Sequence, residues 1–183
     1  MILLMGAAGS GKSTQGHQLA DEYGYAYIST GEVFRVLITG RRRNEMLEGK
    51  LLSDDEVIRV VGKVLELIDT SEQFILDGFP RTRPQIDWLL AQCKTGRFDL
   101  PTVINLEVSE DEVRNRLHRR GRVDDTEESI RYRYQLYEDT TRPLLDYMRQ
   151  NSITVIDVNA GQGSQVVHRQ ILQALGHMDD NKG

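Results

Sequence analysis

The segment GAAGSGKS, residues 6–13, constrains the fold of this chain more than any other part of the sequence. It reads G-x-x-x-x-G-K-S, and it lies between the apolar run MILLM and a stretch of helical character. Glycines let such a loop curl until its backbone N–H groups point at phosphate oxygens, and the helix adds its positive N-terminal end. Lys12 would then reach the terminal phosphates, and the Ser13 hydroxyl would face Mg²⁺. The segment therefore predicts a binding site for a nucleoside triphosphate.

Short apolar runs alternate with longer stretches of helical periodicity along the chain. The runs are almost continuously apolar, as expected of parallel strands that are covered by helices on both faces. We predict strands at residues 2–5, 25–29, 74–76, 103–108 and 153–158. Because strands and helices alternate, the sequence predicts one α/β domain, residues 1–183, with a central parallel sheet.

The helix signals between these strands are clear in three places. Residues 54–68 carry apolar side chains at helical spacing, and SDDE, which begins at Ser53, is a capping box at their start. Pro84 suits the first turn of a further helix. Residues 127–149 are again helical, and Pro143 is expected to kink or restart that helix.

The composition argues against several classes of protein. The net charge of −5 and the pI of about 5.4 argue against a general nucleic-acid binder. The longest apolar run is far too short to span a bilayer, and the single Cys93 allows no internal disulfide, which favours the cytoplasm.

Yet 18 of the 23 basic residues are arginine, and seven of these lie between Arg114 and Arg133. Because arginine suits phosphate, this cluster indicates either a phosphorylated ligand or only a compositional preference.

Asp77 ends an apolar strand in the segment FILDGFP. Burial of a carboxylate is costly unless the group is paired or close to a metal ion. In proteins with a phosphate-binding loop, an acid at the carboxyl end of such a strand helps to hold the magnesium shell. We therefore expect Asp77, together with Ser13, to hold Mg²⁺ through water and the phosphates. A strand-end aspartate that is satisfied by hydrogen bonds alone is the alternative.

Five segments in this order resemble the nucleoside monophosphate kinases, and among them the adenylate kinases best: GAAGSGKSTQ, YISTGEVFR, LDGFPRTRPQ, RGRVDDTEES and VIDVNA. The resemblance implies a P-loop NTPase fold whose five parallel strands have the order 2-3-1-4-5. It also implies an AMP-binding flap at residues 30–59, a reduced lid at residues 117–126, and the reaction Mg·ATP + AMP ⇌ 2 ADP. ATP, AMP and ADP would be the partners and Mg²⁺ the cofactor. A monomer is the family default, and the short lid leaves self-association open.

The resemblance also implies roles for individual residues. The catalytic residues would be cations around the transferring phosphoryl group: Lys12, Arg81, Arg116, Arg120, Arg122 and Arg133. The ATP-binding residues would be Gly6, Ala7, Ala8, Gly9, Ser10, Gly11, Lys12, Ser13, Thr14, Arg116, Arg120, Ala160 and Gln162. The AMP-binding residues would be Thr30, Gly31, Arg35, Met46, Leu52, Val57, Gly78, Arg81, Gln85, Arg122 and Arg133. Asp124 and Asp125 match a pair of acids in the lid.

Two positions favour AMP over other monophosphates. The threonine at position 30 is similar to the adenylate kinases, whereas the uridylate and cytidylate kinases usually have alanine at that position. Gln85 carries a donor and an acceptor that can pair with the edge of adenine, and the pyrimidine kinases typically have asparagine at that place. A kinase for UMP, CMP or another monophosphate is the alternative activity. A nucleotide-binding module without catalysis is a further alternative. However, the lysine and arginines that the resemblance assigns to the phosphates are all present.

The sequence departs from the family pattern in the phosphate-binding loop and in the two flaps. Ser13 stands where most adenylate kinases have glycine, and Ala8 replaces a common proline. Both flaps are shorter than usual, and only Gly121 separates Arg120 from Arg122. No cysteines are available to bind zinc in a lid. Because a lid keeps water from the reacting phosphate, we expect this chain to hydrolyse ATP without AMP more readily than relatives with a lid.

Overall fold

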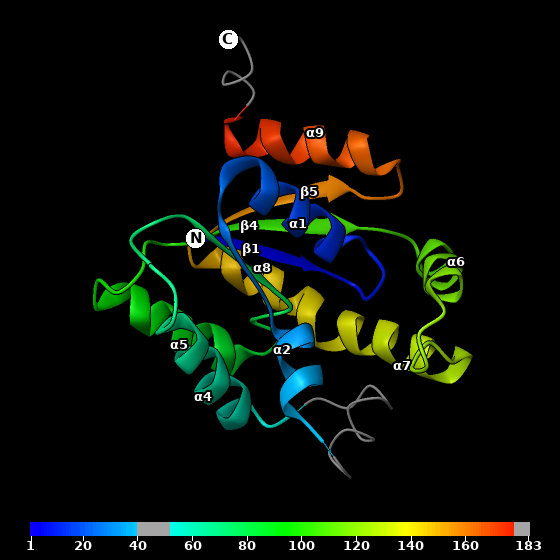
Figure 1. Cartoon of the computed structure of the whole chain (residues 1–183), viewed down its shortest axis with the longest axis horizontal. Helices are drawn as coiled ribbons and strands as arrows, with labels where there is room; N and C mark the ends of the chain where they lie inside the picture. The colour runs from blue at the N-terminus through cyan, green and yellow to red at the C-terminus, as the bar shows by residue number, and fades with distance from the viewer. Residues whose placement is uncertain (40–51, 178–183) are drawn as a thin grey trace.

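The computed structural model describes residues 1–39 and 52–177, and its centre is a five-stranded parallel sheet (Figure 1). The strands are β1 (Ile2–Gly6), β2 (Ala26–Ser29), β3 (Phe74–Asp77), β4 (Thr102–Glu107) and β5 (Thr154–Asn159). Their order is β2-β3-β1-β4-β5, and every neighbouring pair is parallel. The predicted order 2-3-1-4-5 is confirmed, and β1 lies in the middle of the sheet with the phosphate-binding loop at its carboxyl end.

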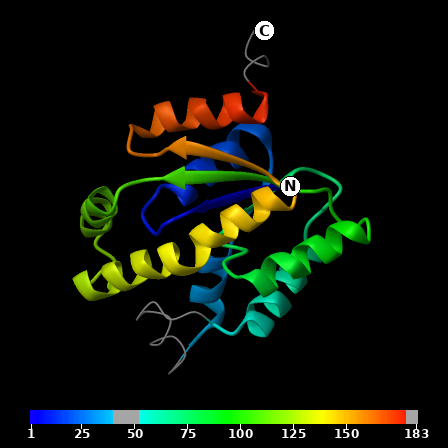
Figure 2. The same ribbon diagram turned by 180° about the vertical axis from the view of Figure 1, so that it is seen from behind.

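Helices cover both faces of the sheet, as strands that are apolar on both sides require (Figures 1 and 2). The helices on one face are α1 (Lys12–Tyr23) and α9 (Ser164–Leu175). The helices on the other face are α2 (Thr30–Leu37), α4 (Asp54–Leu65), α5 (Arg83–Lys94) and α8 (Arg142–Gln150). Beyond the carboxyl ends of the strands lie α6 (Glu110–Arg120) and α7 (Glu127–Leu136).

Strand β1 shows how one sequence supplies both halves of the core. Ile2 and Leu4 pack in the same cluster as Leu19 of α1 and Ile171 of α9, whereas Leu3 packs in the cluster on the opposite face. All five side chains are 0% exposed. Each fully buried aliphatic side chain contributes about 1.5–3 kcal/mol to folding. The strand that carries the phosphate-binding loop is therefore firmly anchored on both faces of the sheet.

A π-helical turn, η1 (Tyr137–Thr141), joins α7 to α8 in one long rod that Figure 2 shows below the sheet. Pro143 lies in the first turn of α8. A proline cannot donate a backbone hydrogen bond to the preceding turn, and the wider π turn accommodates this loss. The restart predicted at Pro143 is therefore present, in the form of a π turn immediately before it.

The helix starts agree with the sequence in most details. Pro84 lies in the first turn of α5, as expected. The helix predicted at residues 54–68 ends earlier, at Leu65. The Ser53 hydroxyl donates to the Glu56 carboxylate at 2.8 Å and does not cap a backbone N–H group, so the expected capping box forms only in part.

In the part of the chain that the structure describes, no helix has the length and apolar character needed to cross a membrane.

Candidate functional site

The phosphate-binding loop joins β1 to α1, and its glycines are required by its geometry. Gly6 has a φ of 137°, and a Cβ atom there would lie 2.6 Å from the backbone oxygen of Leu106. Gly9 has a φ of 81°, and its Cβ would lie 2.9 Å from Cγ of Leu117. A side chain at either position would combine a left-handed backbone with a steric clash. The loop therefore depends on these glycines, as its sequence predicted.

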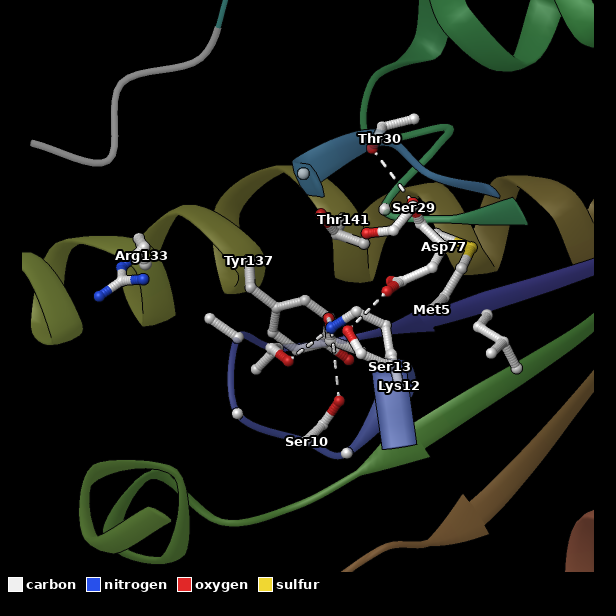
Figure 3. A pocket seen from close by; sticks show the side chains of 18 of the residues that line it. Met5, Ser10, Lys12, Ser13, Ser29, Thr30, Asp77, Arg133, Tyr137 and Thr141 are labelled. Atoms are coloured by element: carbon white, nitrogen blue, oxygen red, sulfur yellow. Dashed lines mark hydrogen bonds between the residues drawn. The ribbon is translucent and has the colours of Figure 1, made fainter. Parts of the chain in front are cut away.

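The ammonium group of Lys12 lies inside this loop (Figure 3). Its Nζ donates hydrogen bonds to the backbone oxygens of Gly6 and Ala7 at 2.8 and 2.7 Å. Removal of the ammonium from water lowers the pKa of Lys12 to about 8; Asp77 opposes the shift, and the charges of Arg81 and Arg120 add to it. At neutral pH Lys12 is therefore still mostly protonated, but it begins to lose its charge near pH 8, and a bound phosphate would favour the charged form.

Asp77, at the end of β3, faces the first turn of α1. Its residue is 4% exposed, and its Oδ2 accepts hydrogen bonds from the Ser13 hydroxyl at 3.0 Å and from the Tyr27 hydroxyl at 2.8 Å. Burial raises the pKa of Tyr27, and the neighbouring carboxylate raises it further. The Thr30 hydroxyl donates to the backbone oxygen of the same aspartate at 3.1 Å. Hydrogen bonds from α1 and β2 therefore hold the carboxylate beside the loop, and a third, from α2, fixes the backbone that carries it.

One cavity of about 650 Å³ brings the predicted site residues together at the carboxyl edge of the sheet. All described residues of the predicted sets line it: Gly6, Ala7, Ala8, Gly9, Ser10, Gly11, Lys12, Ser13, Thr14, Thr30, Gly31, Arg35, Leu52, Val57, Asp77, Gly78, Arg81, Gln85, Arg116, Arg120, Arg122, Arg133, Ala160 and Gln162. Met46, and with it residues 40–51 of the predicted flap, lies outside the described residues. Side chains that are far apart in the sequence thus share one space, which is what a two-substrate site requires.

Arg116, on α6, bridges two walls of the cavity. Its Nη2 donates to the backbone oxygen of Ala160 at 2.7 Å, and its Nη1 donates to that of Ser10 at 3.4 Å. Its Nε donates to the Glu112 carboxylate at 2.7 Å. The guanidinium therefore ties the phosphate-binding loop to the chain after β5, a positioning role that the sequence did not predict.

Two further arginines converge on Asp125, whose side chain is only 1% exposed. Nε and Nη2 of Arg120 donate to the two oxygens of this carboxylate at 2.9 and 2.7 Å, and Nη2 of Arg133 donates to it at 3.0 Å. Arg133 also lies 3.4 Å from Asp124. Burial opposes ionisation of Asp125, but the hydrogen bonds from the two guanidinium groups outweigh it and hold its pKa below the ordinary value.

Arg35 and Arg122 complete the positive side of the cavity. Arg35 donates to the Gly31 backbone oxygen at 3.1 Å and lies 4.0 Å from Asp124. Burial lowers the pKa of Arg35, and the nearby charge of Arg122 lowers it further. Arg122 is exposed at the cavity edge. Lys12 and six arginines line the cavity with Asp77 and Asp124, and Asp125 contacts two of the arginines, so the cations outnumber the acids and favour a ligand with several negative charges.

The opposite end of the cavity is built from β3, α4 and α5. Gly78 has a φ of 78°, and a Cβ there would lie 2.8 Å from Oγ1 of Thr30 and 2.9 Å from Nη2 of Arg81. Leu52 and Val57 supply apolar walls. This end is shaped for a flat, partly apolar group beside a cation.

The sequence did not single out the π turn as part of the site. Tyr137, Thr140 and Thr141 line the cavity, and Tyr137, which Figure 3 labels, packs in one buried cluster with Ala7 of the phosphate-binding loop. The Tyr137 hydroxyl donates to Asn105 of β4 at 3.3 Å, which fixes the turn on the sheet. Pro143 was the only sequence signal nearby, and it indicated a change in the helix without indicating which side chains would turn inward.

Comparison with known proteins agrees with this geometry. A family model described as adenylate kinase matches residues 4–153. The chain is 38% identical over 181 residues to "Adenylate kinase" of Corynebacterium glutamicum (strain R), which covers 96% of this chain and 98% of that protein. It is 40% identical over 181 residues to "Adenylate kinase" of Mycobacterium sp. (strain MCS), with the same coverage. The family match spans the phosphate-binding loop, the strands β2, β3 and β4 and the arginine cluster, and the chain belongs to the adenylate kinase family.

Proposed function

We propose that this chain catalyses reversible transfer of a phosphoryl group from Mg·ATP to AMP, which yields two molecules of ADP. One observation carries the proposal: a single cavity has the phosphate-binding loop at one end, Thr30 and Gln85 at the other, and cations between them. A triphosphate on the loop and a monophosphate at the far end would place their phosphates opposite each other, which is the geometry of in-line transfer.

The chemistry needs positive charge and alignment more than a general base. The second pKa of a phosphate monoester is about 6, so the phosphate of AMP is mostly ionised at neutral pH and can act as the nucleophile directly. Lys12 would neutralise charge on the terminal phosphates of ATP, and Arg81 would hold the phosphate of AMP. Arg120, Arg122 and the other arginines of the cavity would stabilise the charge on the transferring group.

Asp125 would orient two of these cations without occupying all of their donors. Arg120 uses Nε and Nη2 on this carboxylate, which leaves Nη1 for a phosphate oxygen. A guanidinium whose plane is already fixed loses less conformational entropy when a phosphate binds. This supports a role for the acid in preorganising the arginines around the phosphates.

The residues beside the loop fit a magnesium ion. Mg²⁺ prefers oxygen ligands and usually keeps several water molecules. The Ser13 hydroxyl and the Asp77 carboxylate, 3.0 Å apart, supply such oxygens at the start of α1. They would hold the ion through the phosphates and water, and the ion supplies charge neutralisation on the β- and γ-phosphates.

The unpaired Cys93 supports the cytoplasm as the place of action.

A coupled assay for ADP, with Mg·ATP and each of AMP, GMP, UMP and CMP, tests the proposal. AMP should give the highest kcat/KM. Gln85→Asn should lower kcat/KM for AMP more than for the other substrates, because the shorter amide would no longer reach the base. A wild-type preference for UMP or CMP would overturn the assignment of AMP.

A further inference from the structure

The side-chain amide of Gln85 is fully oriented by its neighbours in the structure. The residue is 2% exposed. Its Oε1 accepts a hydrogen bond from the backbone N–H of Arg81 at 2.7 Å, and its Nε2 donates to Oδ1 of Asp54 at 2.8 Å. The same carboxylate oxygen accepts from the Thr82 hydroxyl at 2.6 Å. The first turn of α4 thus reaches across to the first turn of α5 and holds the amide.

These two partners fix which way the amide faces. A backbone N–H can only donate a hydrogen bond, and an ionised carboxylate can only accept one. A 180° rotation of the Gln85 amide would set Oε1 against the Asp54 carboxylate and Nε2 against the Arg81 N–H. Both arrangements are repulsive, and a buried polar group without a partner is costly. The pair of contacts therefore excludes the rotated state.

The remaining capacity of the amide has a defined polarity. A glutamine amide offers two N–H donors and two acceptor positions, and one of each is used here. One donor on Nε2 and one acceptor position on Oε1 remain, and Gln85 lines the cavity. Adenine presents an acceptor, N1, beside the N6 amino donor. Hypoxanthine presents the reverse pattern, an N1–H donor beside the O6 acceptor, on a base of nearly the same shape.

We propose that Asp54 is a specificity-determining positioning residue, which makes the site select an adenine monophosphate over its 6-oxo counterpart. Asp54 acts through Gln85, and the inference therefore rests on the proposed role of Gln85 in the AMP site. In the wild-type protein, pairing with inosine monophosphate requires the amide to rotate against both of its fixed partners. Without Asp54 the rotation opposes only the Arg81 N–H.

The test compares kcat/KM for AMP and for inosine monophosphate in the wild type and in Asp54→Ala. A hydrogen bond to a charged group contributes about 1.5–3 kcal/mol, and 1.4 kcal/mol corresponds to a tenfold change. We expect the AMP-to-IMP ratio of kcat/KM to fall about tenfold or more in Asp54→Ala. Asp54→Asn should also lower the ratio, because an asparagine amide can rotate and donate to the turned Gln85 oxygen, whereas a carboxylate can only accept.

Two controls separate positioning from a general effect on the fold. Asp55→Ala removes the neighbouring exposed acid from the same first turn of α4. It should leave the ratio unchanged, because among the described residues Asp55 makes no hydrogen bond to Gln85. In a Gln85→Ala background, Asp54→Ala should have no further effect on the ratio, since the residue through which it acts is gone. Thermal unfolding of each variant would show whether it is folded at the temperature of the assay.

The outcomes distinguish this inference from the proposed function. A wild-type chain that does not phosphorylate AMP would contradict the proposed function itself. A wild type that prefers AMP over IMP, with the same ratio in folded Asp54→Ala, would overturn only the role of Asp54. A lower ratio that persists to the same degree in the Gln85→Ala background would also overturn it, because Asp54 would then act by another route.

Discussion

Arg120, the last residue of α6, and Asp125, in the connection to α7, form a two-point ion pair with N–O distances of 2.9 and 2.7 Å. Arg133, from α7, contacts the same carboxylate at 3.0 Å. One buried acid therefore holds arginines from both helices. The segment predicted as a reduced lid, residues 117–126, thus contains both Arg120 and the buried acid that holds its side chain.

Replacement of Asp125 by asparagine should destabilise the protein at neutral pH by about 2 kcal/mol, because two guanidinium groups lose a charged partner. The folded-state pKa of Asp125 lies below 3.8, so its contribution is present above pH 3.8 and is lost as pH falls through the lower folded value. Urea unfolding of wild type and Asp125→Asn should show a difference that narrows in acid. A difference independent of pH would contradict a stabilising contribution from this ion pair.

Arg122→Ala should lower kcat by about a hundredfold, as is typical when one donor to transition-state charge is removed. Stability should change by less than about 0.5 kcal/mol, because the Arg122 side chain is exposed. Arg119→Ala is the matched control, since Arg119 belongs to the same cluster, is exposed and does not line the cavity. Equal losses of kcat in both variants would indicate a general charge effect.

The affinity for ATP should fall as the pH rises above about 8. Burial lowers the pKa of Lys12 to about 8, and ATP requires the charged lysine, so binding in this range takes up a proton. Titration calorimetry in two buffers of different ionisation enthalpy should detect this uptake in the wild type and not in Lys12→Met. Proton uptake of equal size in both proteins would assign it to another group.

The same shift has a consequence for folding. The unfolded chain has the ordinary lysine pKa of 10.5, so it binds more protons than the folded chain between about pH 8 and 10.5. The free energy of unfolding of the wild type should therefore rise relative to Lys12→Met as the pH increases through this window. Parallel urea midpoints for the two proteins across that range would contradict a depressed pKa.

The short connection between α6 and α7 should permit some hydrolysis of ATP in the absence of AMP. Only residues 121–126 join the two helices, which leaves little chain to cover the reacting phosphate. Phosphate release from Mg·ATP should be measurable without AMP and should be abolished in Lys12→Met. If release stays at the background of the assay, another part of the assembled protein must exclude water.

Much of the fold could be predicted because its signals are local. Continuous apolar runs marked all five strands to within a residue or two, and the glycines of residues 6–13 fixed the turn after β1. The order of the strands came from the family resemblance, because no local pattern states which strands become neighbours. The sequence predicted a kink or restart at Pro143 but not a π turn. That turn is held by the contact of Tyr137 with β4, which no local pattern shows.

The candidate site was predicted as a set of residues, and the structure adds how they contact one another. The cluster from Arg116 to Arg133 indicated arginines that bind phosphate. In the structure Arg116 also donates to two backbone oxygens, and Arg120 contacts the Asp125 carboxylate. The hydrogen bond between Asp54 and Gln85 joins residues 31 positions apart. Such pairings arise from the tertiary arrangement of helices, and no sequence spacing encodes them.

The most direct test of this account is phosphorus NMR of the purified chain with ATP, AMP and Mg²⁺. The account predicts that ATP and AMP disappear at equal rates, that two ADP form for each ATP, and that ADP alone is converted back to ATP and AMP. Lys12→Met should abolish all three changes. Stable ATP and AMP in the presence of folded wild-type protein would contradict the account.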